Sequence, residues 1–228
     1  MDLLLLDYNG VVADDEPIHY RALRDLLGVE RIALDEVAYR TRYLGLDDRT
    51  CVREVFRRAG RTLDPDALAV LAARKAAWYA ESARHGIPLV DGVASFVRRA
   101  AATARIAVVS GALRVEVGAG LAQSGLADVV SVVISAEDVA AGKPDPEGYR
   151  LAAARLAAGE SAVRAVVIED SRPGIAAARA LGAGCVAITT SHPADELQDA
   201  DRVWRSFADH APADLQPLFR PIAVPARG

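Results

Sequence analysis

Five polar side chains, far apart in the sequence, could together bind a divalent cation and a phosphoryl group: Asp7, Ser110, Lys143, Glu169 and Asp170. Three carboxylates in one place repel one another strongly unless a cation neutralises them. Mg²⁺ suits such a set, because it binds one or two carboxylates while keeping several waters and a phosphate oxygen. A hydroxyl and an ammonium group would hold the remaining phosphoryl oxygens. Each residue alone has an ordinary explanation, such as a helix cap for the acidic pair, but the combination predicts a functional site.

Short apolar stretches predict the strands that would bring these side chains together. They occupy residues 3–6, 105–110, 129–134, 163–168 and 185–188. Continuous apolar runs of this length are typical of parallel strands buried on both faces. Helical patterns separate the later stretches, which predicts an α/β fold with a doubly wound, Rossmann-like parallel sheet. The carboxyl ends of its strands would meet at one edge, where such sheets bind ligands.

The segment between the first two strands has a different, purely helical pattern. Helices are expected at residues 18–27, 33–43, 48–59 and 64–83. We therefore expect a small helical cap domain at residues 14–87, inserted into a core domain formed by residues 1–13 and 88–228. The tail from residue 210 contains four prolines and is predicted to be irregular and to lie on the surface.

Composition excludes several classes of function. The net charge of −4 provides no basic patch for nucleic acid or an anionic membrane. No apolar stretch approaches the ~20 residues of a membrane span, and the short leucine run at the start does not resemble a signal peptide. Cys51 and Cys185 are isolated, so we expect buried free thiols and a cytoplasmic protein. We also expect a monomer or a weak dimer.

Lysine is rare in this chain. Only Lys75 and Lys143 occur among the 27 basic residues; all the others are arginine. The two lysines are therefore candidates for places that need a compact ammonium group rather than a planar guanidinium.

Four short motifs, in order along the chain, resemble those of the haloacid dehalogenase superfamily, subfamily I, in its β-phosphoglucomutase-like and phosphatase branch. They are Asp7-Tyr8-Asn9-Gly10-Val11, Ser110-Gly111, Lys143-Pro144-Asp145-Pro146 and Glu169-Asp170-Ser171. The resemblance covers nearly the whole chain, from about residue 3 to residue 188, and the helical insertion matches the small cap of that family.

The resemblance implies a role for each residue of the motifs. Asp7 would be the nucleophile that accepts the phosphoryl group as an aspartyl-phosphate. Mg²⁺ would be held by the carboxylates of Asp7 and Asp170 and the backbone carbonyl of Asn9, with Glu169 supporting the metal's waters. Ser110, the amide of Gly111 and Lys143 would hold the phosphoryl oxygens. The implied activity is Mg²⁺-dependent hydrolysis or transfer of phosphate from a small phosphorylated metabolite.

By this resemblance, residues of the cap would bind the part of the substrate beyond its phosphoryl group. His19, Lys75 and the stretch 45–49, including Arg49, resemble cap positions of the β-phosphoglucomutase-like branch. For Arg49 a solvated charge on a helix is an equally good explanation.

Asn9 departs from the family pattern, which has aspartate at this position. A backbone carbonyl is indifferent to the change, but an amide has no proton to give to a leaving group, and losing such a group typically costs ~10²–10⁴ in rate. Four explanations stay open. The substrate has a good leaving group, His19 supplies the proton, the protein is a Mg²⁺-dependent phosphometabolite binder, or Asn9 is an introduced change.

Three other activities are compatible with parts of the motif pattern. A phosphomutase of the β-phosphoglucomutase type remains an alternative to the phosphatase. Carbon–halogen hydrolysis is disfavoured, because that branch dispenses with magnesium, whereas Glu169 and Asp170 retain an acidic pair. Phosphonate cleavage through a Schiff base is disfavoured because no lysine lies in the first half of the cap.

Overall fold

The computed structural model describes residues 1–44, 46, 48–157, 159–160 and 162–224. The chain divides into two compact units, one formed by Met1–Asp14 with Pro88–Gly228 and the other by Asp15–Ile87. Each is described by itself.

The larger unit is built on a seven-stranded sheet. Its strands are β1 (Asp2–Leu6), β2 (Arg105–Val109), β3 (Val130–Ile134), β4 (Ala162–Glu169), β5 (Gly184–Ile188), β6 (Arg202–Trp204) and β7 (Arg220–Ala223). The first six are parallel in the order β3-β2-β1-β4-β5-β6, and β7 pairs antiparallel with β4. The four leucines of β1 are completely buried, as the continuous apolar run predicts.

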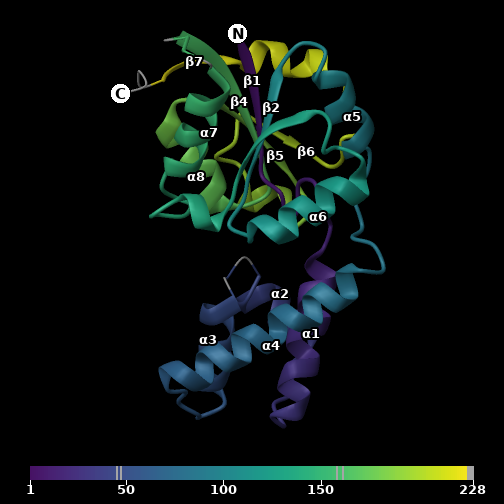
Figure 1. The fold of residues 1–228 in the computed structure, drawn as a ribbon, viewed down its shortest axis with the longest axis vertical. Helices are drawn as coiled ribbons and strands as arrows, with labels where there is room; N and C mark the ends of the chain where they lie inside the picture. Colours follow the sequence, from purple (N-terminus) through teal and green to yellow (C-terminus); the bar gives the residue numbers. More distant parts are fainter. Residues whose placement is uncertain (45, 47, 158, 161, 225–228) are drawn as a thin grey trace. The chain divides into compact units, whose positions relative to one another are not determined.

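Helices cover both faces of this sheet, as the doubly wound prediction requires. The chain moves from β1 to β2 to β3 in one direction through α5 (Val93–Ala100) and α6 (Arg114–Ser124), then returns to β4 and β5 through α7 (Glu147–Ala157) and α8 (Arg172–Leu181). Because crossovers are right-handed, the reversal places α7 and α8 on the face opposite α5 and α6 (Figure 1). The predicted α/β fold is confirmed.

The prediction for the tail was wrong. Beyond residue 210 the chain forms a 3₁₀ segment (Pro212–Leu218) and then β7, and Leu215 and Ile222 are buried. Proline breaks a central strand, but it is tolerated on an edge strand, where Pro221 lies. Strand β7 pairs with the first half of β4, Ala162–Ala165, and β5 pairs with the second half. The fourth proline of the tail lies outside the described residues.

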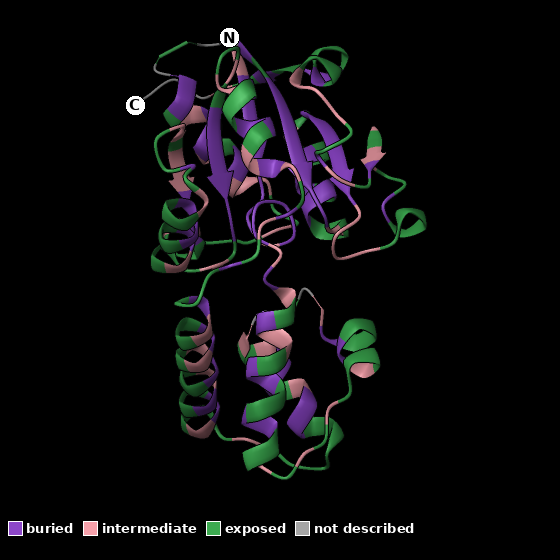
Figure 2. Cartoon of the chain, turned by 90° about the vertical axis from the view of Figure 1, so that its right-hand side faces the viewer, coloured by how far each residue is buried: buried purple, intermediate pink, exposed green. Residues whose placement is uncertain are grey.

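The smaller unit has its own apolar core. Its helices are α1 (Glu16–Val29), α2 (Glu36–Arg42), α3 (Asp48–Arg58) and α4 (Pro65–Ala83). Asp35 and Asp64 cap α2 and α4 by accepting hydrogen bonds from the amides of Ala38 and Ala67. The buried residues form inward-facing stripes on these helices (Figure 2).

Other predictions concern single features. Cys51 and Cys185 are free thiols and both are buried, as predicted. Among the residues described, no helix combines the length and the apolar character needed to cross a bilayer.

Candidate active site

The acidic residues of the larger unit meet at the carboxyl ends of two neighbouring strands. Asp7 directly follows β1, Glu169 is the last residue of β4, and Asp170 comes next. The two strands are in parallel register with Leu6 opposite Ile168, and the amide of Asp7 donates to the carbonyl of Ile168. The chain reverses its winding direction between β1 and β4, which is where open α/β sheets bind ligands.

The three carboxylates are close enough to share one ion. One oxygen from each of Asp7, Glu169 and Asp170 lies within 4.8 Å of the others, and all three residues are buried. Lys143 lies between two of them, with Nζ 2.5 Å from Asp7 Oδ1 and 2.6 Å from Glu169 Oε1. The structure therefore brings four of the predicted site residues together.

The charges of this cluster do not balance. If all three carboxylates were ionised, one ammonium group would leave two negative charges uncompensated in a buried place. Burial, together with the charge of Glu169, raises the pKa of Asp7 to about 7 despite the attraction of Lys143. Burial and the charges of Asp7 and Glu169 raise the pKa of Asp170 well above its ordinary value. A divalent cation would complete the charge, and oxygen ligands of this kind are those that Mg²⁺ prefers, so the residues fit such an ion.

Lys143 remains charged in this setting. Burial by itself would lower the pKa of the ammonium group, but the Asp7 and Glu169 carboxylates together raise it above its ordinary value. The lysine is thus a permanent positive charge at the edge of the sheet.

Ser110 and Asn9 lie beside one another. Ser110 follows β2, is buried, and its hydroxyl donates to Asn9 Oδ1 at 3.3 Å while accepting from the amide of Ala112. Gly111 is exposed directly after Ser110. The side chain of Asn9 is thus oriented by the serine that the sequence predicts to bind phosphoryl oxygen.

Asp170 is held by two features of its surroundings. The hydroxyl of Ser191 donates to Asp170 Oδ2. Gly10 has a φ of +74°, and a Cβ there would lie 1.8 Å from the same oxygen. A side chain at this position would be strained by the positive φ and would collide with the carboxylate, so the turn requires glycine.

Glu169 accepts several hydrogen bonds, and one of the donors, the Tyr149 hydroxyl, was not expected from the sequence. Its Oε1 accepts from the Tyr149 hydroxyl at 2.5 Å, and its Oε2 accepts from the Ser171 hydroxyl and the amide of Asp170. A strand-end signal could have found Ser191, since it follows β5 closely. Tyr149 gave no comparable signal, because it lies within α7.

The smaller unit contains a second buried polar cluster, around Lys75. The ammonium group pairs with Asp48 and lies 2.8 Å from His19 Nδ1. His19 stacks on Tyr79 with ring centroids 4.3 Å apart, and both residues contact Asp15 Oδ2.

Hydrogen bonding assigns the tautomer of His19. Lys75 has only donors, so His19 Nδ1 must accept, and the ring proton is on Nε2, 3.4 Å from Asp15 Oδ2. Two of the predicted cap residues, His19 and Lys75, are therefore in contact with each other. Arg49 is exposed on α3, directly after Asp48 in the sequence, and Gly45 and Asp47 lie outside the described residues.

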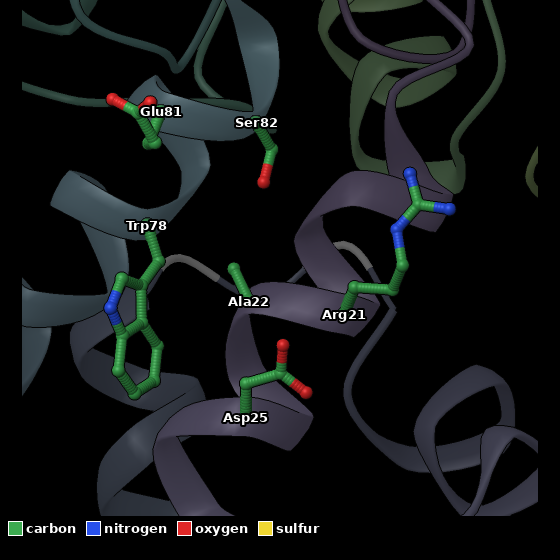
Figure 3. Close-up of a pocket in the computed structure, with 6 residues that line it drawn as sticks. All are labelled: Arg21, Ala22, Asp25, Trp78, Glu81 and Ser82. Carbon is green, nitrogen blue, oxygen red and sulfur yellow. The ribbon is translucent and has the colours of Figure 1, made fainter.

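A surface pocket of about 300 Å³ lies between α1 and α4 of the smaller unit (Figure 3). It is lined by Arg21, Ala22 and Asp25 from α1 and by Trp78, Glu81 and Ser82 from α4. None of the predicted site residues lines it, and its charged side chains are exposed. We therefore place the candidate site at the edge of the sheet.

Comparison with known proteins agrees with this architecture. Residues 1–182 match the family of haloacid dehalogenase-like hydrolases. Fructose-1-phosphate phosphatase YqaB of Escherichia coli is 31% identical over 183 residues, which cover 80% of this chain and 94% of that protein. A validoxylamine A 7'-phosphate phosphatase of Streptomyces hygroscopicus is 41% identical over 85 residues, which cover 37% of this chain and only 39% of that protein.

Solved structures are also similar. Two crystal structures of CbbY from Rhodobacter sphaeroides, one with phosphate and one of a mutant with xylulose-(1,5)bisphosphate, superpose with a TM-score of 0.78. They are 26% and 27% identical to this chain, and the match covers 91% of it and 95% of CbbY.

Proposed function

Since the chain belongs to the haloacid dehalogenase-like hydrolases, we propose that it is a Mg²⁺-dependent phosphatase acting on a small phosphorylated sugar. One observation carries the proposal: three buried carboxylates, those of Asp7, Glu169 and Asp170, lie together with a single ammonium group, that of Lys143. The similar proteins act on or bind small phosphorylated molecules, by the names they carry, which supports the substrate class.

Asp7 is the nucleophile in this proposal. Its carboxylate attacks phosphorus, the bond to the sugar oxygen breaks, and the phosphoryl group is held as an aspartyl-phosphate until water releases it. Lys143 stabilises the charge on the phosphoryl oxygens, and Ser110 and the amide of Gly111 donate hydrogen bonds to them.

The carboxylates of Asp7 and Asp170 and the backbone carbonyl of Asn9 would hold Mg²⁺, which when bound neutralises negative charge on the cluster and on the phosphoryl group. Glu169 pairs with Lys143 through a second contact, in addition to the one that Lys143 makes with Asp7.

Asn9 limits the reaction in a specific way. Its side chain accepts a hydrogen bond from Ser110 and has no titratable proton, so it cannot protonate the leaving oxygen. Substrates whose leaving group needs no proton, such as acyl phosphates, should therefore react faster than simple alkyl phosphates.

The test compares the chain as given with Asn9→Asp and Asp7→Asn on sugar phosphates and acyl phosphates, with and without Mg²⁺. We expect Asn9→Asp to raise the rate on sugar phosphates by about 10²–10⁴-fold. We expect Asp7→Asn to abolish turnover on every substrate, by at least about 10³-fold. Hydrolysis that survives Asp7→Asn would contradict the proposal.

A non-catalytic binding protein is the second candidate, and Asn9 is the observation that favours it. Replacing an acid by an amide removes a negative charge that would oppose a phosphate anion, so binding tightens while proton transfer is lost. Tight Mg²⁺-dependent binding of a sugar phosphate, with no turnover by either the chain as given or Asn9→Asp, would favour the binder. Transfer of phosphate between two sugar positions would instead favour a phosphomutase.

A further inference from the structure

Tyr149 contacts two residues of the charged cluster at once. It lies on α7, six residues after Lys143, and is 1% exposed. Its hydroxyl donates to Glu169 Oε1 at 2.5 Å, and the ammonium nitrogen of Lys143 lies 5.3 Å from the centre of its ring. A tyrosine that only filled the core would need neither contact.

The hydroxyl of Tyr149 and the ammonium group of Lys143 share one acceptor. Lys143 Nζ is 2.6 Å from Glu169 Oε1, the oxygen that Tyr149 also uses, and 2.5 Å from Asp7 Oδ1. The ammonium group is thus divided between two carboxylates. Every hydrogen bond that Glu169 Oε1 accepts from another donor weakens its attraction for Lys143.

Glu169 cannot move to compensate. Its other oxygen accepts from Ser171 and from the amide of Asp170, and the residue is completely buried. On α8, a Cβ added to Gly174 would lie 1.8 Å from the carboxyl carbon of Glu169. The position of Lys143 between Asp7 and Glu169 is therefore sensitive to the tyrosine hydroxyl.

We propose that Tyr149 is a positioning residue whose hydroxyl moderates the pull of Glu169 on Lys143 and keeps the ammonium group directed toward Asp7. The consequence for phosphoryl binding rests on the function proposed above, whereas the effect on Lys143 does not. In this role the ring of Tyr149 lies against the ammonium group of Lys143, and its hydroxyl occupies part of Glu169 Oε1, so that Glu169 attracts Lys143 less strongly.

The scarcity of lysine makes a direct test simple. Labelling with ¹³C,¹⁵N-lysine yields side-chain NMR signals from Lys75 and Lys143 alone, and Lys143→Arg assigns them. In Tyr149→Phe the ring remains, so a change in the Lys143 side-chain signals reports the loss of the hydroxyl. We expect those signals to move and the affinity for inorganic phosphate, measured with Mg²⁺ present, to fall about 2–10-fold, the worth of one hydrogen bond.

Tyr79→Phe is the matched control. Tyr79 is also buried, and its hydroxyl also donates to a carboxylate at 2.5 Å, that of Asp15 in the smaller unit. We expect this variant to move the Lys75 signals, through His19, and to leave the Lys143 signals and phosphate affinity unchanged.

A double-mutant cycle separates moderation of Glu169 from simple packing. If the hydroxyl acts through Glu169, Tyr149→Phe should have much less effect on the Lys143 signals in a Glu169→Gln background than alone. Equal effects in both backgrounds would overturn the proposal, as would unchanged Lys143 signals or unchanged phosphate affinity in Tyr149→Phe. None of these readouts needs turnover. If the protein hydrolyses no phosphate ester, the proposed phosphatase activity is refuted, but the role of Tyr149 in positioning Lys143 is still tested by the NMR signals.

Discussion

Two buried polar clusters, one in each unit, are each built around one of the chain's two lysines. In the larger unit Lys143 pairs with Asp7 and Glu169, two of three clustered carboxylates, so one ammonium group faces three acidic side chains. In the smaller unit Lys75 pairs with Asp48, which is 34% exposed, and its ammonium nitrogen lies 2.8 Å from His19 Nδ1. The first cluster has two more carboxylates than ammonium groups, whereas the second has one more, Asp15, whose Oδ2 is contacted by Tyr79 and His19.

The comparison shows that burial of a lysine does not by itself mark a catalytic site. What distinguishes Lys143 is the excess of carboxylates around it, held rigidly by strand ends and by Gly10 and Gly174. Lys75 connects α4 with α1 and α3, through His19 and Asp48, and that connection favours a structural role. A role of His19, Lys75 and Arg49 in substrate binding, and of His19 as a proton donor, stays a prediction.

The largest effect is expected from Lys143→Met. Removing the ammonium group takes away the positive charge that stabilises developing negative charge on the phosphoryl group, and kcat/KM should fall about 10²–10³-fold. Steady-state kinetics on the best substrate measures this. Lys75→Met, the same substitution at the chain's other lysine, is the control, and a comparable loss there would erase the distinction between the two clusters.

Mg²⁺ should stabilise the larger unit in a pH-dependent way. Burial raises the pKa of Asp7 to about 7, above the ordinary value of 3.8 that applies in the unfolded chain. Without metal, the folded state therefore binds more protons than the unfolded state between these values, and stability falls as pH rises through this window. Mg²⁺ binds the ionised carboxylates, so its stabilising effect should grow with pH.

Thermal unfolding with EDTA or MgCl₂ at several pH values, from about 5 to about 8, measures this effect. At 100 times the dissociation constant the gain at the upper pH is about 2.7 kcal/mol. An Mg²⁺ effect that is equal at all pH values would contradict the assignment of Asp7 and Asp170 as the ion's ligands.

Lys75→Met should act on stability rather than chemistry. It leaves Asp48 without its ammonium partner and His19 Nδ1 without its donor. The free energy of unfolding should fall by about 1–3 kcal/mol, less than for a fully buried ion pair, because water can reach the partly exposed Asp48. Chemical denaturation measures the change. Asp48→Asn in the same background should recover part of it, and failure to do so would show that Asp48 is not the partner that matters.

The smallest effect is expected from Ser191→Ala. Its hydroxyl donates to Asp170, so its loss should weaken Mg²⁺ affinity about 2–10-fold while leaving the Lys143 signals in place. Calorimetric titration with Mg²⁺ measures the affinity. Ser171→Ala, which removes a donor from Glu169 instead, should affect Mg²⁺ less.

The sequence alone determined the sheet, the edge at which the site lies and the family. Continuous apolar runs report burial on both faces of a parallel strand, and a polar residue at the end of each run reports its place at the edge, so Asp7, Ser110 and Asp170 could be predicted from local pattern. The rarity of lysine similarly marked Lys75 and Lys143 before their contacts were known.

Tertiary structure alone decided which side chains touch. That Tyr149 and Lys143 share one oxygen of Glu169, that Ser191 binds Asp170, and that Lys75 pairs with Asp48 depend on how helices and strands pack, which no period in the sequence encodes. The tail eluded prediction for the same reason. From sequence alone, a proline predicts an irregular segment. In the structure, Pro221 lies in the edge strand β7, where the missing amide costs no hydrogen bond to a neighbouring strand.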